Sequence, residues 1–272
     1  MQIHIFLVLC VLAPFFSAPS LRGETIAFLY ALEQDLTSLV AAGATVARTE
    51  TVGDRTVRTY RLGTHTVVGA MMTSGQAESA VSIATVLAKH RVDAVVTTGV
   101  VGALDDDFRI GQTVLIDKVF AWQAGSHHAG AWTETPRSRP NLLLWTKFKS
   151  EVPSSGVASG DVFIADDAER VRLRSVSGMP LVDMNLVGIQ IAATAHGLPV
   201  FHLRVVSDRA DDRASEDFRK FASSYRGELG LRIAELIKAL PADEQSPDSY
   251  PALKNLLPGV GAETKEASRS AE

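Results

Sequence analysis

One short stretch of the chain sets a carboxyl group where it could act on a substrate. In "RVVSDRADD" (204–212), a predicted strand at 200–206 ends and leads directly into Ser207 and Asp208. If burial raises the pKa of that carboxyl group, it keeps a proton near neutral pH and can act as a general acid. The alternative is an aspartate that caps the next turn, which is a common use of this residue type after a strand. Asp208 is therefore the first candidate catalytic residue.

A second stretch, "ALEQDL" at 31–36, offers Glu33 and Asp35 at the start of a predicted helix. Two carboxyl groups that flank one bond are the arrangement by which glycosidic bonds are generally hydrolysed, so one of these residues could pair with Asp208. Acidic residues are also favourable in the first turn of any helix, because they interact with its dipole. The residues alone do not decide between the two roles.

Both stretches belong to an alternation of short apolar runs and longer helical segments. The predicted strands are residues 25–31, 57–62, 66–72, 94–98, 113–120 and 200–206. The predicted helices are 76–89 with Ser74 as its N-cap, 186–196, and a long final helix at 215–240 with a kink near Gly227 and Gly230. Residues 122–140 read as a long irregular connection. Such alternation predicts a mostly parallel sheet covered by helices, in which ligands bind beyond the carboxyl ends of the strands.

Length and charge narrow the class of partner. The chain has 272 residues, 46% of them hydrophobic, which is enough to bury the core of a single domain. A net charge of -4 and a pI near 6.0 give no electrostatic reason to expect nucleic acid or an anionic membrane surface as a partner. His127 and His128 are adjacent and lack the spaced partners of a zinc site. A small molecule is the expected partner, and no metal is expected.

The two ends of the chain differ in composition from the rest. Residues 1–20 contain no Asp, Glu, Lys or Arg and carry an apolar run of signal-peptide length, with small residues suited to cleavage before Leu21. They predict an exported protein, periplasmic or secreted; a misassigned start codon or an uncleaved anchor is the alternative. The predicted folded domain is 21–240. Residues 241–272 are rich in Pro, Ser, Ala and acidic residues without a sustained period, and they predict a disordered tail.

Six segments, in this order and at these intervals, resemble the purine nucleoside phosphorylase/uridine phosphorylase superfamily. They are "ALEQDL" (31–36), "TSGQAESA" (73–80), "TTGVVGAL" (97–104), "SGDVFIAD" (159–166), "VDMNLVGIQIA" (182–192) and "RVVSDRADD" (204–212). The resemblance extends over roughly 25–240 and is strongest to the methylthioadenosine/S-adenosylhomocysteine nucleosidases. It implies a three-layer α/β/α nucleoside phosphorylase-like fold with a central mixed, mostly parallel sheet. It also implies a homodimer without an organic cofactor that hydrolyses the N-glycosidic bond of a purine nucleoside, releasing adenine or a related base.

The resemblance also implies roles for individual residues. Asp208 is the acid that protonates the leaving purine, Ser207 bonds the base or orients that carboxyl group, and Asp35 activates water. The remaining contacts are, by position, Ser74 and Arg204 near the nucleophile, Met184 and Asn185 beside the ribose, and Phe163 and Ile164 against the base. Met184, Phe163 and Ile164 would look the same as ordinary core residues. A buried Arg204 needs a partner, for which Asp35 or a substrate oxygen are the candidates.

Two residues depart from the family pattern. Asn185 falls where the family has a glutamate that holds the ribose hydroxyls, and an amide carries no charge to support a developing cation. Asp35 is one methylene shorter than the family's glutamate, with Glu33 as the fallback. One alternative is therefore a catalytically weakened nucleoside-binding or storage protein of the same fold.

The other alternative is a phosphate-dependent nucleoside phosphorylase. The phosphorylase branch of the family holds phosphate with an arginine in an Arg-Xaa-Gly-Ser/Thr run. The corresponding segment here, "TTGVVGAL", has no arginine. Water is therefore the predicted nucleophile.

Overall fold

A computed structural model describes residues 23–128, 131–134 and 152–240. The predicted signal segment, the predicted tail and much of the 122–140 connection lie outside the described residues. None of the helices in the described ranges is long and apolar enough to cross a membrane.

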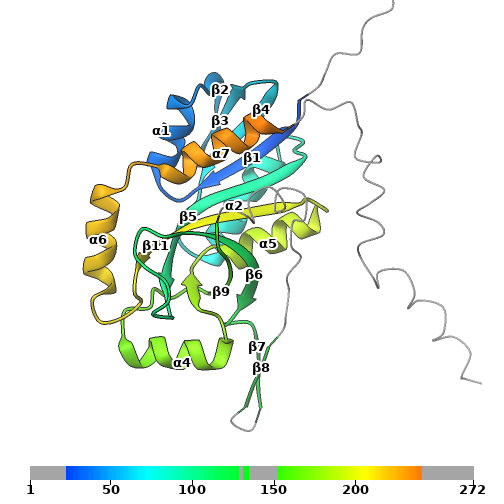
Figure 1. Ribbon diagram of the computed structural model, residues 1–272. Helices are drawn as coiled ribbons and strands as arrows, with labels where there is room; N and C mark the ends of the chain where they lie inside the picture. The colour runs from blue at the N-terminus through cyan, green and yellow to red at the C-terminus, as the bar shows by residue number, and fades with distance from the viewer. Residues whose placement is uncertain (1–22, 129–130, 135–151, 241–272) are drawn as a thin grey trace, which may run out of the picture. The chain divides into compact units, whose positions relative to one another are not determined.

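A nine-stranded mixed sheet forms the centre of the fold (Figure 1). Its strands are β1 (Thr25–Tyr30), β2 (Thr45–Val52), β3 (Arg55–Leu62), β4 (His65–Met71), β5 (Ala94–Ala103), β6 (Thr113–Ala121), β9 (Ser154–Ser159), β10 (Leu181–Asp183) and β11 (Val200–Asp208). They lie in the order β10-β9-β6-β11-β5-β1-β4-β3-β2. Strands β11, β5, β1 and β4 run parallel, while β6, β3 and β2 join by antiparallel pairings. The predicted mixed α/β architecture is confirmed.

Strand β5 is longer than predicted and organises one end of the sheet. Its first half pairs with β1, most of its length pairs with β11, and its last two residues pair with β10 in the antiparallel sense. Because β10 also pairs with β9 at the far end of the strand order, this half of the sheet closes on itself. The closure brings Asp183 at the end of β10 and Asp208 at the end of β11 against the last part of β5.

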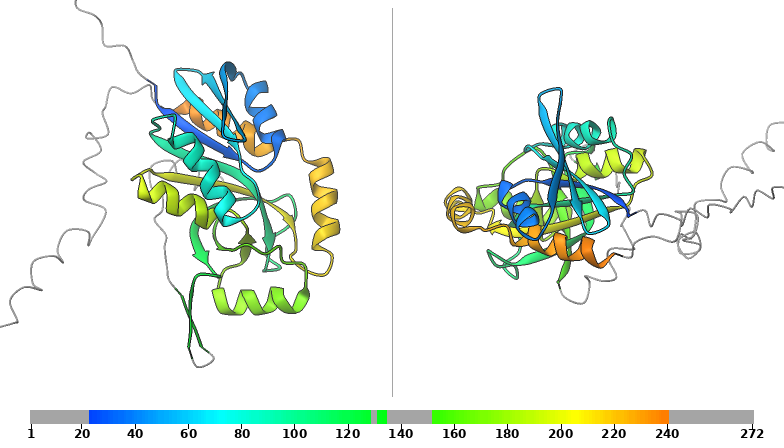
Figure 2. Two further views of the ribbon diagram at one scale, coloured as in Figure 1. Left: turned by 180° about the vertical axis from the view of Figure 1, so that it is seen from behind. Right: turned by 90° about the horizontal axis from the view of Figure 1, so that it is seen from above.

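Helices cover both faces of the sheet (Figure 2). They are α1 (Glu33–Ala41), α2 (Gln76–Leu87), α4 (Asp167–Ser177), α5 (Leu186–Ala195), α6 (Ala214–Ser224) and α7 (Glu228–Ala239). Strand β1 shows how the sequence produces the layers, since successive side chains of a strand point to opposite faces. Phe28 and Tyr30 pack into the core that includes α1 and α7, whereas Ala27 and Leu29 pack into the core that includes α2 and α5.

The structure differs from the prediction in several elements. The segment predicted as one helix at 215–240 is two helices, because Gly227 takes a left-handed conformation (φ 86°) and its Cα lies too close to the carbonyl of Gln34 to carry a side chain. Strands β2, β9 and β10 were not predicted: β2 is polar and largely exposed, and β9 and β10 are short. Helix α4, which is rich in charged residues, was also missed. Part of the connection predicted to be irregular is a hairpin of β7 (Gly125–His128) and β8 (Ala131–Glu134).

Candidate active site

Asp208 ends β11 and is buried, with only 2% of its surface exposed. Its Oδ2 accepts a hydrogen bond from Ser207 Oγ at 2.7 Å, and its Oδ1 accepts one from the backbone N–H of Ala210 at 2.9 Å. Burial raises the pKa of the Asp208 carboxyl group, and these two donors oppose the shift. The bond to Ala210 is the turn cap that the sequence also allowed, so the residue caps a turn and is a buried acid at once.

A β-bulge and a glycine explain how Asp208 fits at this place. The pairing of β11 with β5 shifts register between Val206 and Asp208, and such a bulge redirects the side chains that follow it. Asp208 then lies opposite Gly102, where an added Cβ would stand 2.8 Å from Asp208 Oδ1. Gly102 therefore leaves the space that the carboxyl group occupies.

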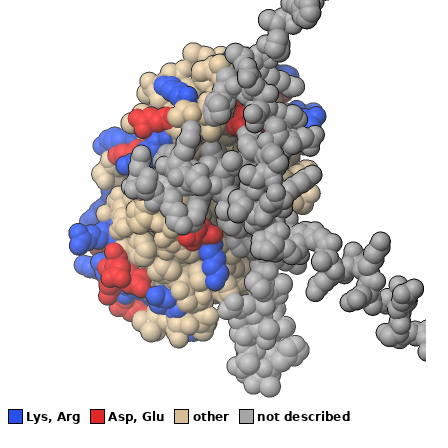
Figure 3. All heavy atoms as spheres, turned by 45° about the vertical axis from the view of Figure 1, so that its right-hand side comes forward, with Lys and Arg blue, Asp and Glu red and all other residues tan. Residues whose placement is uncertain are grey.

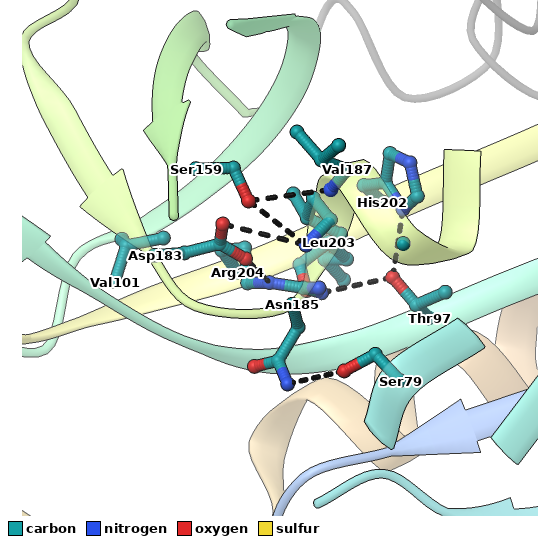
Figure 4. Close-up of polar contacts among 12 residues, drawn as sticks. Ser79, Thr97, Val101, Ser159, Asp183, Asn185, Val187, His202, Leu203 and Arg204 are labelled. Carbon is teal, nitrogen blue, oxygen red and sulfur yellow. Dashed lines mark hydrogen bonds and ion pairs between the residues drawn. The ribbon is translucent and has the colours of Figure 1, made fainter. Parts of the chain in front are cut away.

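Arg204, also on β11, is 1% exposed and lies beside the buried carboxyl group of Asp183 (Figure 4). Its Nε is 3.9 Å from Asp183 Oδ2, and its Nη1 donates to Thr97 Oγ1 and to the carbonyl of Leu203, each at 2.9 Å. Burial lowers the pKa of Arg204 to about 10, while the charges of Asp183 and Asp35 oppose that change. The guanidinium group lies against Gly99, where an added Cβ would stand 3.6 Å from Arg204 Cζ and Nε.

Asp183 is the carboxylate partner that the sequence did not reveal. It belongs to the three-residue strand β10, which carries no recognisable strand pattern, and its side chain is fully buried. Burial raises the pKa of the Asp183 carboxyl group, and the charge of Arg204 opposes the shift. In the sequence, the only indication that Asp183 belongs to the site was its place next to Met184 and Asn185 in the "VDMNL" segment.

The two acidic residues of α1 have different environments. Asp35 is fully buried; its Oδ1 accepts hydrogen bonds from the Tyr225 hydroxyl at 2.5 Å and from the backbone N–H of Gly230 at 3.1 Å. Burial raises the pKa of the Asp35 carboxyl group, while the bond from Tyr225 opposes the shift. Glu33 is exposed and lies 3.5 Å from Arg58. Glu33 thus fits the ordinary role of a surface acid in a first helical turn, and Asp35 does not.

Asp35, Asp183 and Arg204 form a charged cluster. Three atoms of this cluster are buried and make no hydrogen bond within the described ranges. They are Asp35 Oδ2, Asp183 Oδ2 and Arg204 Nη2. Buried polar atoms are nearly always satisfied in folded proteins, so each of these atoms calls for a partner. The hydroxyl group of Thr98, also buried and unpaired in the described ranges, interacts with Asp35 and opposes the rise in its pKa. A water molecule can both donate and accept, so it suits the carboxylate oxygens and the guanidinium nitrogen alike.

Asn185 precedes α5 and is half-buried between the charged cluster and α2 (Figure 4). Its Nδ2 donates to the carbonyl of Thr73 at 2.8 Å and to Ser79 Oγ at 2.7 Å. These bonds use both N–H groups of the amide. The carbonyl oxygen Oδ1 is therefore the atom that Asn185 can offer to a ligand.

The start of α2 is arranged differently from the prediction. Ser74 is exposed and is not the N-cap; that position belongs to Gly75, whose φ of 109° disfavours other residues. The backbone N–H of Gln76 is capped instead by Asp161 Oδ1 at 2.6 Å, from a segment 85 residues away. The backbone N–H of Gly75 donates to the carbonyl of Met184 at 3.1 Å, which ties this turn to the residue beside Asn185.

Phe163 and Ile164 follow β9 and have unlike surroundings. Ile164 is 3% exposed and packs among apolar residues that include Leu173. Phe163 is 43% exposed, and its ring meets that of Phe218 in α6 edge to face, with centroids 6.3 Å apart. Of the two, only Phe163 presents a large apolar surface.

Basic and acidic side chains are interspersed on the described part of the face in Figure 3. Within the described residues, Asp106 pairs with both Arg170 and Arg209. Within the described ranges, no group of three or more His, Cys, Asp or Glu residues is placed to hold a metal ion.

Comparison with known proteins gives the family. The chain is 25% identical over 208 residues to the aminodeoxyfutalosine nucleosidase of Campylobacter jejuni, covering 72% of this chain and 90% of the relative. It is 26% identical over 231 residues to a 5'-methylthioadenosine/S-adenosylhomocysteine nucleosidase of Shewanella piezotolerans, covering 79% and 99%. Among solved structures, the S-adenosylhomocysteine nucleosidase of Streptococcus pyogenes, in complex with 5-methylthiotubericidin, superposes with a TM-score of 0.72 at 21% identity, covering 80% of this chain and 98% of that one. The model of the Phosphorylase superfamily matches residues 25–238, and the chain belongs to that family.

Proposed function

We propose that this protein hydrolyses the N-glycosidic bond of a purine nucleoside, with 5'-methylthioadenosine or S-adenosylhomocysteine as the substrates to test first. The observation that carries the proposal is the buried carboxyl group of Asp208, whose pKa is raised by burial, on the same strand as Arg204 and its charged cluster. The two residues are four positions apart, or roughly 13 Å along a strand, which leaves room for the glycosidic bond between them. The nucleosidase activity of the relatives named above supports the same reaction.

In the proposed reaction, the C1'–N bond breaks and its electron pair leaves with the purine. Asp208 donates its proton to the purine, which makes the base a better leaving group. Water held near Arg204 attacks C1' of the cationic sugar, and Asp35 accepts the proton that the water loses. Both carboxyl groups flank the bond, as in the hydrolysis of glycosides generally.

The charged cluster favours water over phosphate as the nucleophile. Two of its three unsatisfied atoms are carboxylate oxygens, from Asp35 and Asp183, and only one is a guanidinium nitrogen. Water can donate to both carboxylates and accept from Arg204. A phosphate ion has few protons to donate, and it would be repelled by Asp35 and Asp183 in their charged forms, which the charge of Arg204 favours. This supports the hydrolase over the phosphorylase.

The test measures base release from purified protein. We expect 5'-methylthioadenosine to release free adenine at the same rate with and without inorganic phosphate. Chromatography measures the adenine. Release that requires phosphate would establish the phosphorylase instead. Tight binding without release would establish the nucleoside-binding protein.

Asn185→Glu tests whether the neutral residue limits turnover. We expect the added carboxylate to raise kcat for a ribonucleoside, because a negative charge beside the sugar stabilises the developing cation. The same change removes one donor to the carbonyl of Thr73, which still accepts from Ser79 Oγ, so we expect the free energy of unfolding to fall by about 0.5–1.5 kcal/mol. Steady-state kinetics and thermal unfolding measure the two effects. Asn185→Gln, which keeps the amide, is the control, and a lower kcat in the glutamate variant would contradict the role proposed for this position.

The homodimer and the export expected from the sequence stay predictions.

A further inference from the structure

A chain of buried polar side chains runs behind Arg204 and takes no part in the reaction proposed above. Thr97 Oγ1 on β5 lies 2.9 Å from Arg204 Nη1 and 2.9 Å from His202 Nδ1 (Figure 4). On the other side of the imidazole ring, His202 Nε2 lies 3.2 Å from Gln190 Oε1 in α5. Thr97, His202, Gln190 and Arg204 are each at most 5% exposed. The chain therefore connects α5 to the charged cluster without contact with water.

The groups at the two ends set the direction of the hydrogen bonds in this chain. A guanidinium group only donates, so Thr97 Oγ1 accepts from Arg204. An amide oxygen only accepts, so His202 carries a proton on Nε2 and donates it to Gln190 Oε1. In a neutral ring Nδ1 then has no proton, and it accepts the hydrogen of the Thr97 hydroxyl group. Burial lowers the pKa of His202 well below its usual value, and the charge of Arg204 lowers it further, which agrees with a neutral ring.

The chain also fixes where Arg204 points. The guanidinium group is planar and rigid, so its orientation is defined once two of its nitrogens are held. Nη1 is held by Thr97 and by the carbonyl of Leu203, and Nε faces Asp183. The third nitrogen, Nη2, has no hydrogen-bond partner among the residues that the structure describes. Its direction is thus set by the contacts on the opposite side of the group.

We infer that Thr97, His202 and Gln190 are positioning residues that fix the guanidinium group of Arg204 for the nucleophilic water. The expected effect on kcat rests on the proposed function. The expected tautomer of His202 rests on the hydrogen-bond directions alone. None of the three residues touches the substrate. Their loss should therefore lower kcat and leave KM nearly unchanged, because a small misplacement of a catalytic group acts mainly on the transition state.

The kinetic test compares Thr97→Val with Thr97→Ser. Valine keeps the shape of threonine and removes the hydroxyl group, whereas serine keeps the hydroxyl group. We expect the valine variant to lose about 10- to 100-fold in kcat, with KM within about twofold of the unchanged protein. The serine variant should stay within about threefold in kcat. Ser177→Ala is the control, since it removes a buried hydroxyl group that bonds to Leu173 and Met179 in another part of the fold.

The spectroscopic test uses the unchanged protein with 15N-labelled histidine, and its signals are assigned to His202 by comparison with His202→Asn. We expect a neutral ring with the proton on Nε2 throughout pH 6–8. A proton on Nδ1, or a charged ring, would overturn the inference, as would unchanged kcat in Thr97→Val or equal losses in the valine and serine variants. If the unchanged protein releases no base from any purine nucleoside, the proposed function fails. The tautomer of His202 still tests whether the hydrogen bonds between Arg204 and Gln190 have the inferred directions.

Discussion

Asp208→Asn is expected to lower kcat by about 10²- to 10⁴-fold, which is the usual contribution of a general acid. Asparagine has the shape of aspartate but no proton to give to the purine. The fold should persist, because the amide oxygen can still accept from the backbone N–H of Ala210, and the amide nitrogen can donate to Ser207 Oγ. Ser207 can then direct its own hydrogen to the carbonyl of Val101, which already lies 3.3 Å away.

The pH dependence of the unchanged protein should report the same group. Asp208 acts in its protonated form, and burial raises the pKa of its carboxyl group. The protonated fraction therefore persists to higher pH than for an exposed aspartate, and it is lost as pH rises through the raised pKa. We expect kcat to fall on that alkaline side, and we expect this fall to be absent from the residual activity of Asp208→Asn.

The measurement is adenine release over a range of pH, together with thermal unfolding of each variant. Asp93→Asn is the control, because Asp93 is an exposed carboxylate that bonds to the backbone N–H of Thr25 at the other end of the sheet. It should keep full activity. If Asp208→Asn were as active as the unchanged protein, the acid would have to be another residue.

The second large effect is expected from Asp35→Asn, with Glu33→Gln as its matched control. Asp35→Asn keeps an oxygen to accept from Tyr225 and Gly230, so the contact between α1 and α7 is preserved. It places an amide nitrogen where the unpartnered Oδ2 was, and this nitrogen can neither accept the proton of water nor offset the charge of Arg204. We expect kcat to fall by about 10²-fold, the lower end of the range for a general base.

Glu33→Gln should stay within about twofold of the unchanged kcat, because its carboxylate is exposed and its pairing with Arg58 is weak. Measuring kcat of both variants with 5'-methylthioadenosine distinguishes the role of Asp35 from that of Glu33. The opposite pattern, a large loss in Glu33→Gln and none in Asp35→Asn, would assign the water-activating role to Glu33 and show Asp35 to be structural.

The sequence by itself determined the fold class and the family, and it predicted which residue is the acid. Alternating residues in strands and the residues after each strand are local patterns, so they can be recognised without knowledge of the partners. This is why Asp35 after β1, Ser74 after β4 and Asp208 at the end of β11 were predicted as site residues before their surroundings were known.

Only the tertiary structure decided which side chains meet. The pairing of Arg204 with Asp183 depends on the closure of the sheet between β5 and β10, and the burial of Asp35 depends on α7. The bond between Asp35 and Tyr225 joins residues 190 positions apart, and the bond between Thr97 and Arg204 joins residues 107 apart. The physical reason is that periodicity tells which face a side chain occupies, whereas a hydrogen bond needs two particular atoms within about 3 Å. That coincidence is created by strand order and helix packing, and no local pattern contains it.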